Sequence, residues 1–190
     1  MRGTAKITGN TNTSTADWQA DGVSSAGVFS MSGGFISGNR ATGTSGRFKA
    51  GAAVLRGGSS EVSSDARISD NEAISGAVGA AGGVYFDNAS GVFALSGNAV
   101  IGGNAATISG AANTGAGGVY MVQSSGFSKT GGSLIYGVNP YRNPRAEADD
   151  NRIANGSSLS GHAAYAAAIK RKANGDVPGD LTPPSPFSGG

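Results

Sequence analysis

Short apolar runs separated by Gly, Ser and Asn recur along the whole chain. The clearest copy starts after two glycines with Val84-Tyr85-Phe86, continues with Phe93-Ala94-Leu95 and ends at Ile101-Gly102-Gly103-Asn104. Each run is short and bounded by turn-forming residues, which favours β-strands over helices. Similar copies surround Val54 and Val119. The chain is therefore built from an internal repeat.

Two elements mark the register of this repeat. The first is an isoleucine that in most copies precedes an asparagine by three residues, with spacings of 29, 32, 33 and 34 residues between Ile7, Ile36, Ile68, Ile101 and Ile135. The second is a Gly-Gly-Val-Tyr element, which alternates with the first and is marked by Val23, Val54, Val84, Val119 and Ala164.

A repeat of about 30 residues that holds three short strands matches one turn of a parallel β-helix, in which stacked turns pair their backbones and share one core. Parallel crossover connections are right-handed by default. We therefore predict an all-β fold, a right-handed single-stranded parallel β-helix of about five turns with three short strands per turn.

Equivalent residues of successive turns are expected to stack on one another. The isoleucines form an internal aliphatic column, and Phe29, Phe93 and Phe127 form an aromatic column with Val62 in the same position. Asparagine tolerates left-handed φ, and its amide can bond to the amides above and below it. We expect a structural ladder at one corner from Asn10, Asn39, Asn71 and Asn104.

The repeat becomes irregular after Ile135, where the last Ile-x-x-Asn copy carries one inserted residue and ends at Asn139. Residues 137–160 contain prolines and a charged run and are predicted to leave the rod. The solenoid is then expected to resume and to end near residue 175. Residues 176–190, rich in Pro, Gly and Ser, are predicted to be a C-terminal tail.

Composition narrows the function classes. The 14 basic residues are scattered and the net charge is only +2, which argues against a nucleic-acid partner. The absence of cysteine excludes disulfides, thiolate metal sites and a cysteine nucleophile. No apolar run reaches the length of about 18 residues that spans a membrane, and no signal peptide is visible. The chain starts in mid-repeat, which predicts that it was cut from a longer protein.

Candidate catalytic groups are few. His162 is the only histidine, and no sequence motif gives it a partner, so we interpret it as a surface residue. Glu61, Asp65, Asp70 and Glu72 fall in one turn beside Arg67, where a solvated corner is favoured over a hydrolytic pair. The same holds for Asp149-Asp150 as a calcium site. We predict no catalytic residue, no metal and no cofactor.

Two surfaces are candidates for binding a partner. Tyr85, Tyr120 and Tyr165 share one position of the repeat, and strand alternation turns them outward if the preceding valines point inward. An exposed tyrosine row is a candidate interaction surface, although self-stacking tyrosines and tyrosines that point inward stay open. Lys170-Arg171-Lys172 follows the last predicted strand and is expected to be solvated. Threonines do not recur in register, which argues against ice binding.

The repeats resemble those of bacterial surface proteins. Gly82 to Phe86, the segment from Phe29 to Asn39, and the closing segment Gly161 to Ala166 with Lys170-Arg171-Lys172 resemble treponemal and gut-bacterial right-handed β-helix repeats. They are also similar to the passenger repeats of chlamydial polymorphic outer-membrane proteins. Ala52-Ala53 departs from the Gly-Gly of the pattern.

This resemblance implies an extracellular or cell-surface location and an adhesin-like role without enzyme activity. The expected partners are the chain itself, through end-to-end stacking into filaments, or a host-surface protein or glycan. The alternative is a β-helix that binds or degrades a polysaccharide.

Overall fold

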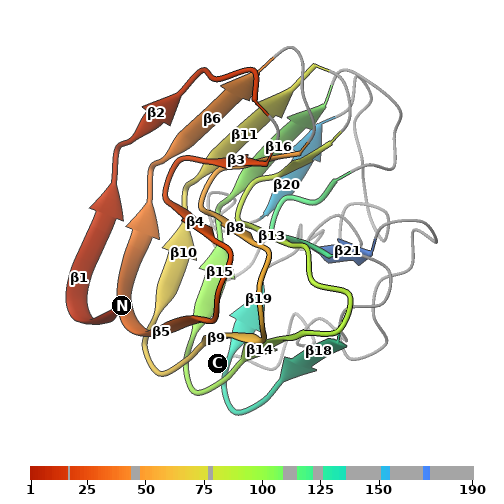
Figure 1. The fold of residues 1–190 in the computed structure, drawn as a ribbon. Coiled ribbons are helices and arrows are strands. Elements are labelled where there is room, and N and C mark those ends of the chain that lie inside the picture. Colours follow the sequence, from red (N-terminus) through yellow and green to blue (C-terminus); the bar gives the residue numbers. More distant parts are fainter. Residues whose placement is uncertain are drawn as a thin grey trace, which may run out of the picture.

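The computed structural model describes residues 1–16, 18–43, 48–76, 79–108, 115–121, 126–135, 151–154 and 169–171. The regular structure of these residues consists of short β-strands, and the paired strands run parallel (Figure 1). Successive strands of each sheet come from successive repeats of the chain, so the fold is a β-solenoid. The predicted all-β parallel β-helix is thereby confirmed.

Four parallel sheets form the walls of the solenoid. The largest has eight strands: β1 (Arg2–Thr8), β5 (Phe29–Ser37), β9 (Ser60–Val62), β10 (Arg67–Ser69), β14 (Val92–Leu95), β15 (Val100–Gly102), β18 (Gly126–Lys129) and β19 (Leu134–Ile135). The second sheet has five: β2 (Thr11–Asn12), β6 (Arg40–Gly43), β11 (Glu72–Ser75), β16 (Ala105–Ile108) and β20 (Arg152–Ala154).

The remaining two sheets are built from shorter segments. The third sheet has three strands: β3 (Gln19–Ala20), β7 (Lys49–Ala50) and β12 (Ala80–Ala81). The fourth has five: β4 (Val23–Ser25), β8 (Ala53–Leu55), β13 (Val84–Phe86), β17 (Val119–Met121) and β21 (Ile169–Arg171). A single bridge between Ala81 and Ala116 carries the third sheet into the next coil.

Each coil has more strands than the three that the pattern predicts. The coil from β10 to β14 visits the large, second, third and fourth sheets in turn and then returns to the large sheet. The coils that begin with β1 and β5 follow the same course, so three consecutive coils place strands in every sheet. The two additional strands of a coil are rich in alanine, for example β12 and β16, and small residues give no strong apolar signal.

The predicted isoleucine column is confirmed. Strand register places Ile7 beside Ile36, and the following isoleucines continue the column to Ile135. Ile36, Ile68 and Ile101 are fully buried in it. An aliphatic side chain that repeats once per coil thus stabilises the interior along the whole solenoid.

Two other predicted columns need correction. Phe29 and Phe93 both pair with Ser60, whereas Val62 pairs with Met31 and Leu95. Phe127 does continue the aromatic column, with its ring centroid 6.3 Å from that of Phe93. In the valine column the prediction placed Val54 one residue too far along, because Ala53 is the partner of both Val23 and Val84.

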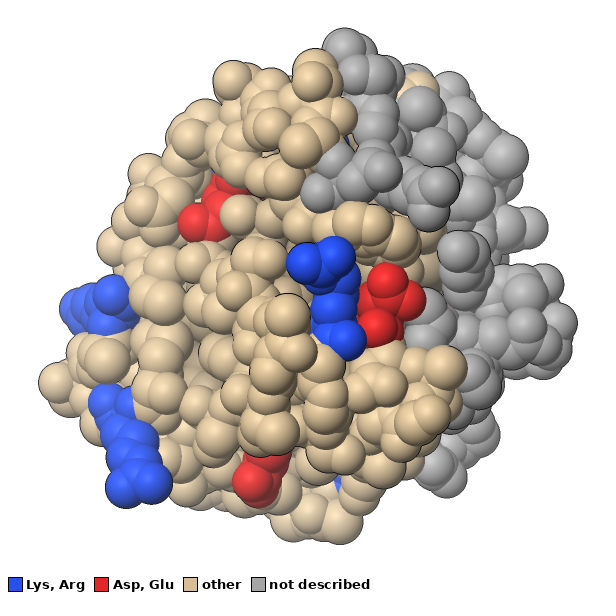
Figure 2. Space-filling model, in the orientation of Figure 1, with Lys and Arg blue, Asp and Glu red and all other residues tan. Residues whose placement is uncertain are grey.

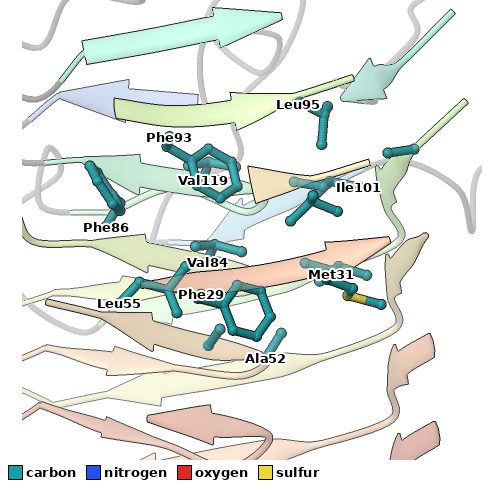
Figure 3. Close-up of a cluster of buried hydrophobic side chains, with 14 of the residues drawn as sticks. Phe29, Met31, Ala52, Leu55, Val84, Phe86, Phe93, Leu95, Ile101 and Val119 are labelled. Carbon is teal, nitrogen blue, oxygen red and sulfur yellow. The ribbon is translucent and has the colours of Figure 1, made fainter. Parts of the chain in front are cut away.

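The main core lies between the large sheet and the fourth sheet. Figure 3 shows Phe29, Met31 and Phe93 of the large sheet meeting Val84 and Val119 of the fourth. A smaller core between the second and third sheets contains Ala73, Ala80, Ala106 and Ile108. The small residues allow these two sheets to approach each other closely.

The end of the chain departs from the predicted boundaries. Strand β20 lies inside residues 137–160, which were expected to leave the rod. The closing strand is β21, in which Ile169 pairs with Val119, so the expected equivalence of Ala164 is wrong. Lys170 and Arg171 therefore belong to a strand and do not follow the last one. The predicted tail, 176–190, lies outside the described residues.

Candidate functional site

The tyrosine row is a buried feature of the fourth sheet. Tyr85 and Tyr120 are register partners on β13 and β17, and they are 0% and 1% exposed. Val84 packs into the main core and Tyr85 into a separate cluster on the opposite face of the strand. The valine and the tyrosine thus lie on opposite faces of the strand, but Tyr85 and Tyr120 are buried, so the candidate exposed surface is wrong for these two residues. Tyr165 lies outside the described residues, and the register partner of Tyr120 in the next coil is Lys170.

Two aromatic residues from earlier coils cover these tyrosines. Phe48 precedes β7. Its ring centroid lies 4.5 Å from the ring centroid of Tyr85 and 4.9 Å from that of Tyr120. Trp18 precedes β3 and stacks at 5.4 Å on Tyr85 and at 6.0 Å on Phe48. The coils that supply Trp18 and Phe48 carry smaller residues, Ser24 and Val54, at the tyrosine position. The four rings form an aromatic stack, in which every ring lies within stacking distance of a ring from another coil.

Burial governs the chemistry of these tyrosines. The pKa of Tyr85 is raised above its ordinary value, chiefly by burial and also by the nearby Asp87 charge. Burial raises the pKa of Tyr120 to about 12. The Tyr85 hydroxyl has no hydrogen-bond partner within the described part of the chain. Neither phenol is suited to proton transfer near neutral pH.

The predicted asparagine ladder is present at the corner between the large and second sheets. The side-chain amide of Asn10 donates to Asn39 Oδ1 at 2.8 Å, Asn39 donates to Asn71 at 2.9 Å, and Asn71 donates to Asn104 at 2.8 Å. The backbone amides of the same residues donate to the same oxygens at 3.1 Å. The ladder joins neighbouring coils through side-chain and backbone donors alike.

A fifth rung was missed because of an insertion. Asn104 donates to Asn151 Oδ1 at 2.8 Å, so the ladder continues at Asn151. The predicted ladder stopped at Asn104, and the next Ile-x-x-Asn copy of the pattern ended at Asn139, which lies outside the described residues. The sequence does carry a signal for this rung, namely an asparagine directly before a short strand, Asn151-Arg152-Ile153. It matches Asn104-Ala105-Ala106, because Arg152 and Ile153 pair with Ala105 and Ala106.

The acidic residues of the third coil are spread along it and contact neighbouring coils. Arg40 Nε lies 2.6 Å from Glu72 Oε2, and Ser96 Oγ donates to Glu61 at 3.1 Å. Asn98 donates to Asp65 at 3.2 Å. Asp70 is exposed at the corner with a φ of 58°. The described residues contain no group of three or more His, Asp or Glu side chains suited to a metal ion.

A buried lysine and a partly buried aspartate whose carboxylate oxygens are enclosed were missed by the sequence analysis. Lys49 is 1% exposed, and its ammonium donates to the carbonyls of Ser14 and Ala16 at 2.8 and 2.6 Å. Asp21 comes directly after β3. In the next two coils the same position, directly after β7 and β12, is a glycine, Gly51 and Gly82.

The Asp21 carboxylate oxygens are buried and have no hydrogen-bond partner among the described residues. Burial raises the pKa of Asp21 to about 6, although the Asn12 backbone and the Lys49 charge act in the opposite direction. Two features of the sequence could have indicated these residues. Asp21 stands where other coils have glycine, and Lys49 lies between the apolar residues Phe48 and Ala50. The Lys49 ammonium thus holds two carbonyls of the segment that precedes Trp18.

The face drawn in Figure 2 shows no cluster of like charges among the described residues. On the face in Figure 2, the described Lys, Arg, Asp and Glu side chains stand apart or beside the opposite charge, within a broad uncharged area. His162 and Asp149-Asp150 lie outside the described residues. Within the described part of the chain, no helix has the length and apolar character needed to cross a membrane.

Comparison with known proteins adds no relative: no family model, no curated protein and no solved structure matches this chain.

Proposed function

We propose that this chain is a structural, adhesin-like segment of an extracellular bacterial surface protein, without enzyme activity. The observation that carries the proposal is the asparagine ladder, which links five coils from Asn10 to Asn151. A polar network of this kind stabilises the extension of a solenoid along its axis. A stiff solenoid is suited to presenting a binding surface at a fixed distance from the cell. End-to-end assembly of such segments would lengthen that distance.

The polar side chains support this role. Arg40 and Glu72 join the second coil to the third, and Glu61 with Ser96 joins the third to the fourth. Tyr85 and Tyr120, which belonged to the candidate ligand surface, pack in the aromatic stack. These groups serve contacts between coils, which is the use expected in a scaffold.

Immunolabelling of the source organism tests the proposed location. Antibodies raised against the folded chain are expected to label intact cells as strongly as permeabilised cells. An antibody against a cytosolic protein is the control for cell integrity. Labelling that requires permeabilisation would contradict a surface role.

A carbohydrate-active β-helix is the second candidate. It is favoured by the exposed Asp65, Asp70 and Arg67 on one coil. A glycan array and a polysaccharide-degradation assay separate the two candidates. We expect no degradation by the wild-type chain. Degradation that is lost in Asp70→Asn, but kept in Asp87→Asn after strand β13 of the fourth sheet, would replace the structural role by an enzymatic one.

A further inference from the structure

One half of the large sheet presents a row of side chains that alternate between cationic and apolar. Strand register places Phe35 of β5 between Lys6 of β1 and Arg67 of β10, and these strands lie side by side in Figure 1. Val100 of β15 continues the row beside Arg67. The two cations are exposed, and the two apolar side chains are partly exposed. The next residue of each strand belongs to the isoleucine column, so strand alternation turns this row to solvent.

A row of hydroxyl groups runs beside the first row, two residues further along each strand. Thr8 pairs with Ser37, and Ser37 pairs with Ser69. Thr8 is exposed and the two serines are partly exposed. Within the described part of the chain, none of the three hydroxyls forms a hydrogen bond, so all three are available to a ligand. The two rows together are named the Phe35 face, which comprises Lys6, Phe35, Arg67, Val100, Thr8, Ser37 and Ser69.

The two cations of the Phe35 face have no carboxylate partner, unlike the arginine around the corner of the solenoid. Arg40 of β6 pairs with Glu72, whereas neither Lys6 nor Arg67 forms an ion pair among the described residues. Lys6 Nζ lies 5.7 Å from the ring centroid of Phe35, a contact that favours one position of the ammonium. Two strand spacings, about 10 Å, separate the backbones that carry the two cations. The face thus holds two positive charges at a fixed separation with an aromatic ring between them.

We propose that the Phe35 face binds an acidic polysaccharide that carries a carboxylate on every second sugar, and that it does so without cleaving the chain. The carboxylates of such a polymer are one disaccharide apart, which suits two cations on alternate coils. The C–H groups of the sugar between them pack against the exposed part of Phe35, and its hydroxyls bond to the serine and threonine row. This inference names the ligand of the proposed adhesin-like function and rests on that function.

Two other anionic partners fit the Phe35 face less well. A nucleic acid requires a longer series of cations, because its affinity grows with the number of phosphates that are neutralised. A membrane surface requires a broad apolar surface beside the cations. Among the described residues, the exposed large hydrophobic side chains are Val28 and Val92, which precede β5 and begin β14 and so lie off this row.

Calorimetric titration of the folded full chain with a hyaluronan octasaccharide, which has one carboxylate per disaccharide, tests the proposal. We expect saturable binding with a Kd of about 10 to about 500 μM, and about tenfold weaker binding of the same probe after its carboxylates are reduced to alcohols. Arg67→Gln should weaken binding about fivefold or more. Arg56→Gln is the matched control, because Arg56 is also an exposed arginine but follows β8 of the fourth sheet. Circular dichroism verifies that the variants are folded.

Asp70→Asn tests the charge of the face in the opposite direction. Asp70 is exposed at the corner directly after Ser69, and its φ of 58° is one that asparagine tolerates. Removal of this negative charge beside the face should tighten binding of the octasaccharide about twofold at low salt. Weaker binding by Asp70→Asn would contradict recognition of an acidic ligand.

Other results of the titration would overturn the proposal. These are an absence of binding at about 1 mM octasaccharide, equal affinity for the carboxyl-reduced probe, and equal weakening by Arg56→Gln. Tighter binding to a DNA duplex or to phosphatidylglycerol vesicles would overturn it by assigning the face to another partner. Each of these results leaves the scaffold role in place, whereas labelling confined to permeabilised cells would remove the proposed function without changing the measured affinity.

Discussion

The side-chain amide of Asn71 donates to Asn104 Oδ1 over 2.8 Å, and both side chains are buried. The same amide donates to Ile36 O and Ser69 O at 2.9 Å, while Asn71 Oδ1 accepts from the side chain and backbone of Asn39. One residue therefore satisfies polar groups of three successive coils.

Asn71→Ala should destabilise the fold by about 3 kcal/mol, because it leaves several buried donors and acceptors without partners. Denaturant titration measures the change in free energy of unfolding. Asn10→Ala, at the exposed end of the ladder, is the comparison and should cost about 1 kcal/mol. Equal losses at the two positions would contradict the importance of the buried rungs.

Ser60→Ala should stabilise the protein by about 1 kcal/mol. Ser60 is 2% exposed between Phe29 and Phe93, and its hydroxyl has no hydrogen-bond partner in the described structure. Ser133 is an equally buried serine whose hydroxyl donates to Thr130 O at 2.8 Å. Thermal unfolding of both alanine variants should show opposite shifts, and a loss of stability at Ser60 would show that its hydroxyl has a partner.

Asp21 should make stability fall as the pH rises from about 4 to about 7. Its pKa is about 6 in the fold against 3.8 in the unfolded chain, so the folded state holds the proton more tightly. The resulting stabilisation is complete below the unfolded value and is lost as the pH passes through the folded value. After discounting for solvent screening it amounts to about 1 kcal/mol.

Asp21→Asn removes this titration and should flatten the stability profile between pH 4 and pH 7. Asp87→Asn is a control on a partly exposed carboxylate. Denaturation midpoints over the pH range provide the measurement. A profile that Asp21→Asn leaves unchanged would assign the pH dependence to another group.

Gly82→Ala should prevent folding or cost more than about 3 kcal/mol. A β-carbon at Gly82 would lie 2.4 Å from the Gly117 carbonyl oxygen and 2.6 Å from the Ala105 amide nitrogen, both rigid backbone atoms. Gly27 has no heavy atom within 4 Å of such a β-carbon, so Gly27→Ala should be neutral or slightly stabilising. Soluble yield and thermal unfolding of the pair measure the difference. A well-folded Gly82→Ala protein would mean that the coils can separate at this bend.

The amino-acid sequence by itself determined the period of the solenoid, the isoleucine column and four rungs of the asparagine ladder. Each of these has one residue type at one position of nearly every coil. Stacking in a parallel solenoid is a contact between equivalent positions, so such a repeat directly predicts which residues are neighbours. Ile36 beside Ile68 and Asn39 beside Asn71 are examples.

Only the tertiary structure decided the features in which the repeat varies. In Ala52-Ala53-Val54, either Ala53 or Val54 could occupy the position of Val84 in the repeat. The backbone pairing shows that Ala53 is the partner of Val84. A long insertion moved the last rung to Asn151.

The tyrosines were predicted from strand alternation, which gives the face of a strand but not what covers that face. Trp18 and Phe48 reach Tyr85 from other coils. Trp18 and Phe48 share one position of the repeat and Tyr85 has another, so their contact depends on how the third and fourth sheets meet. For that reason an expected binding surface became part of the packed interior.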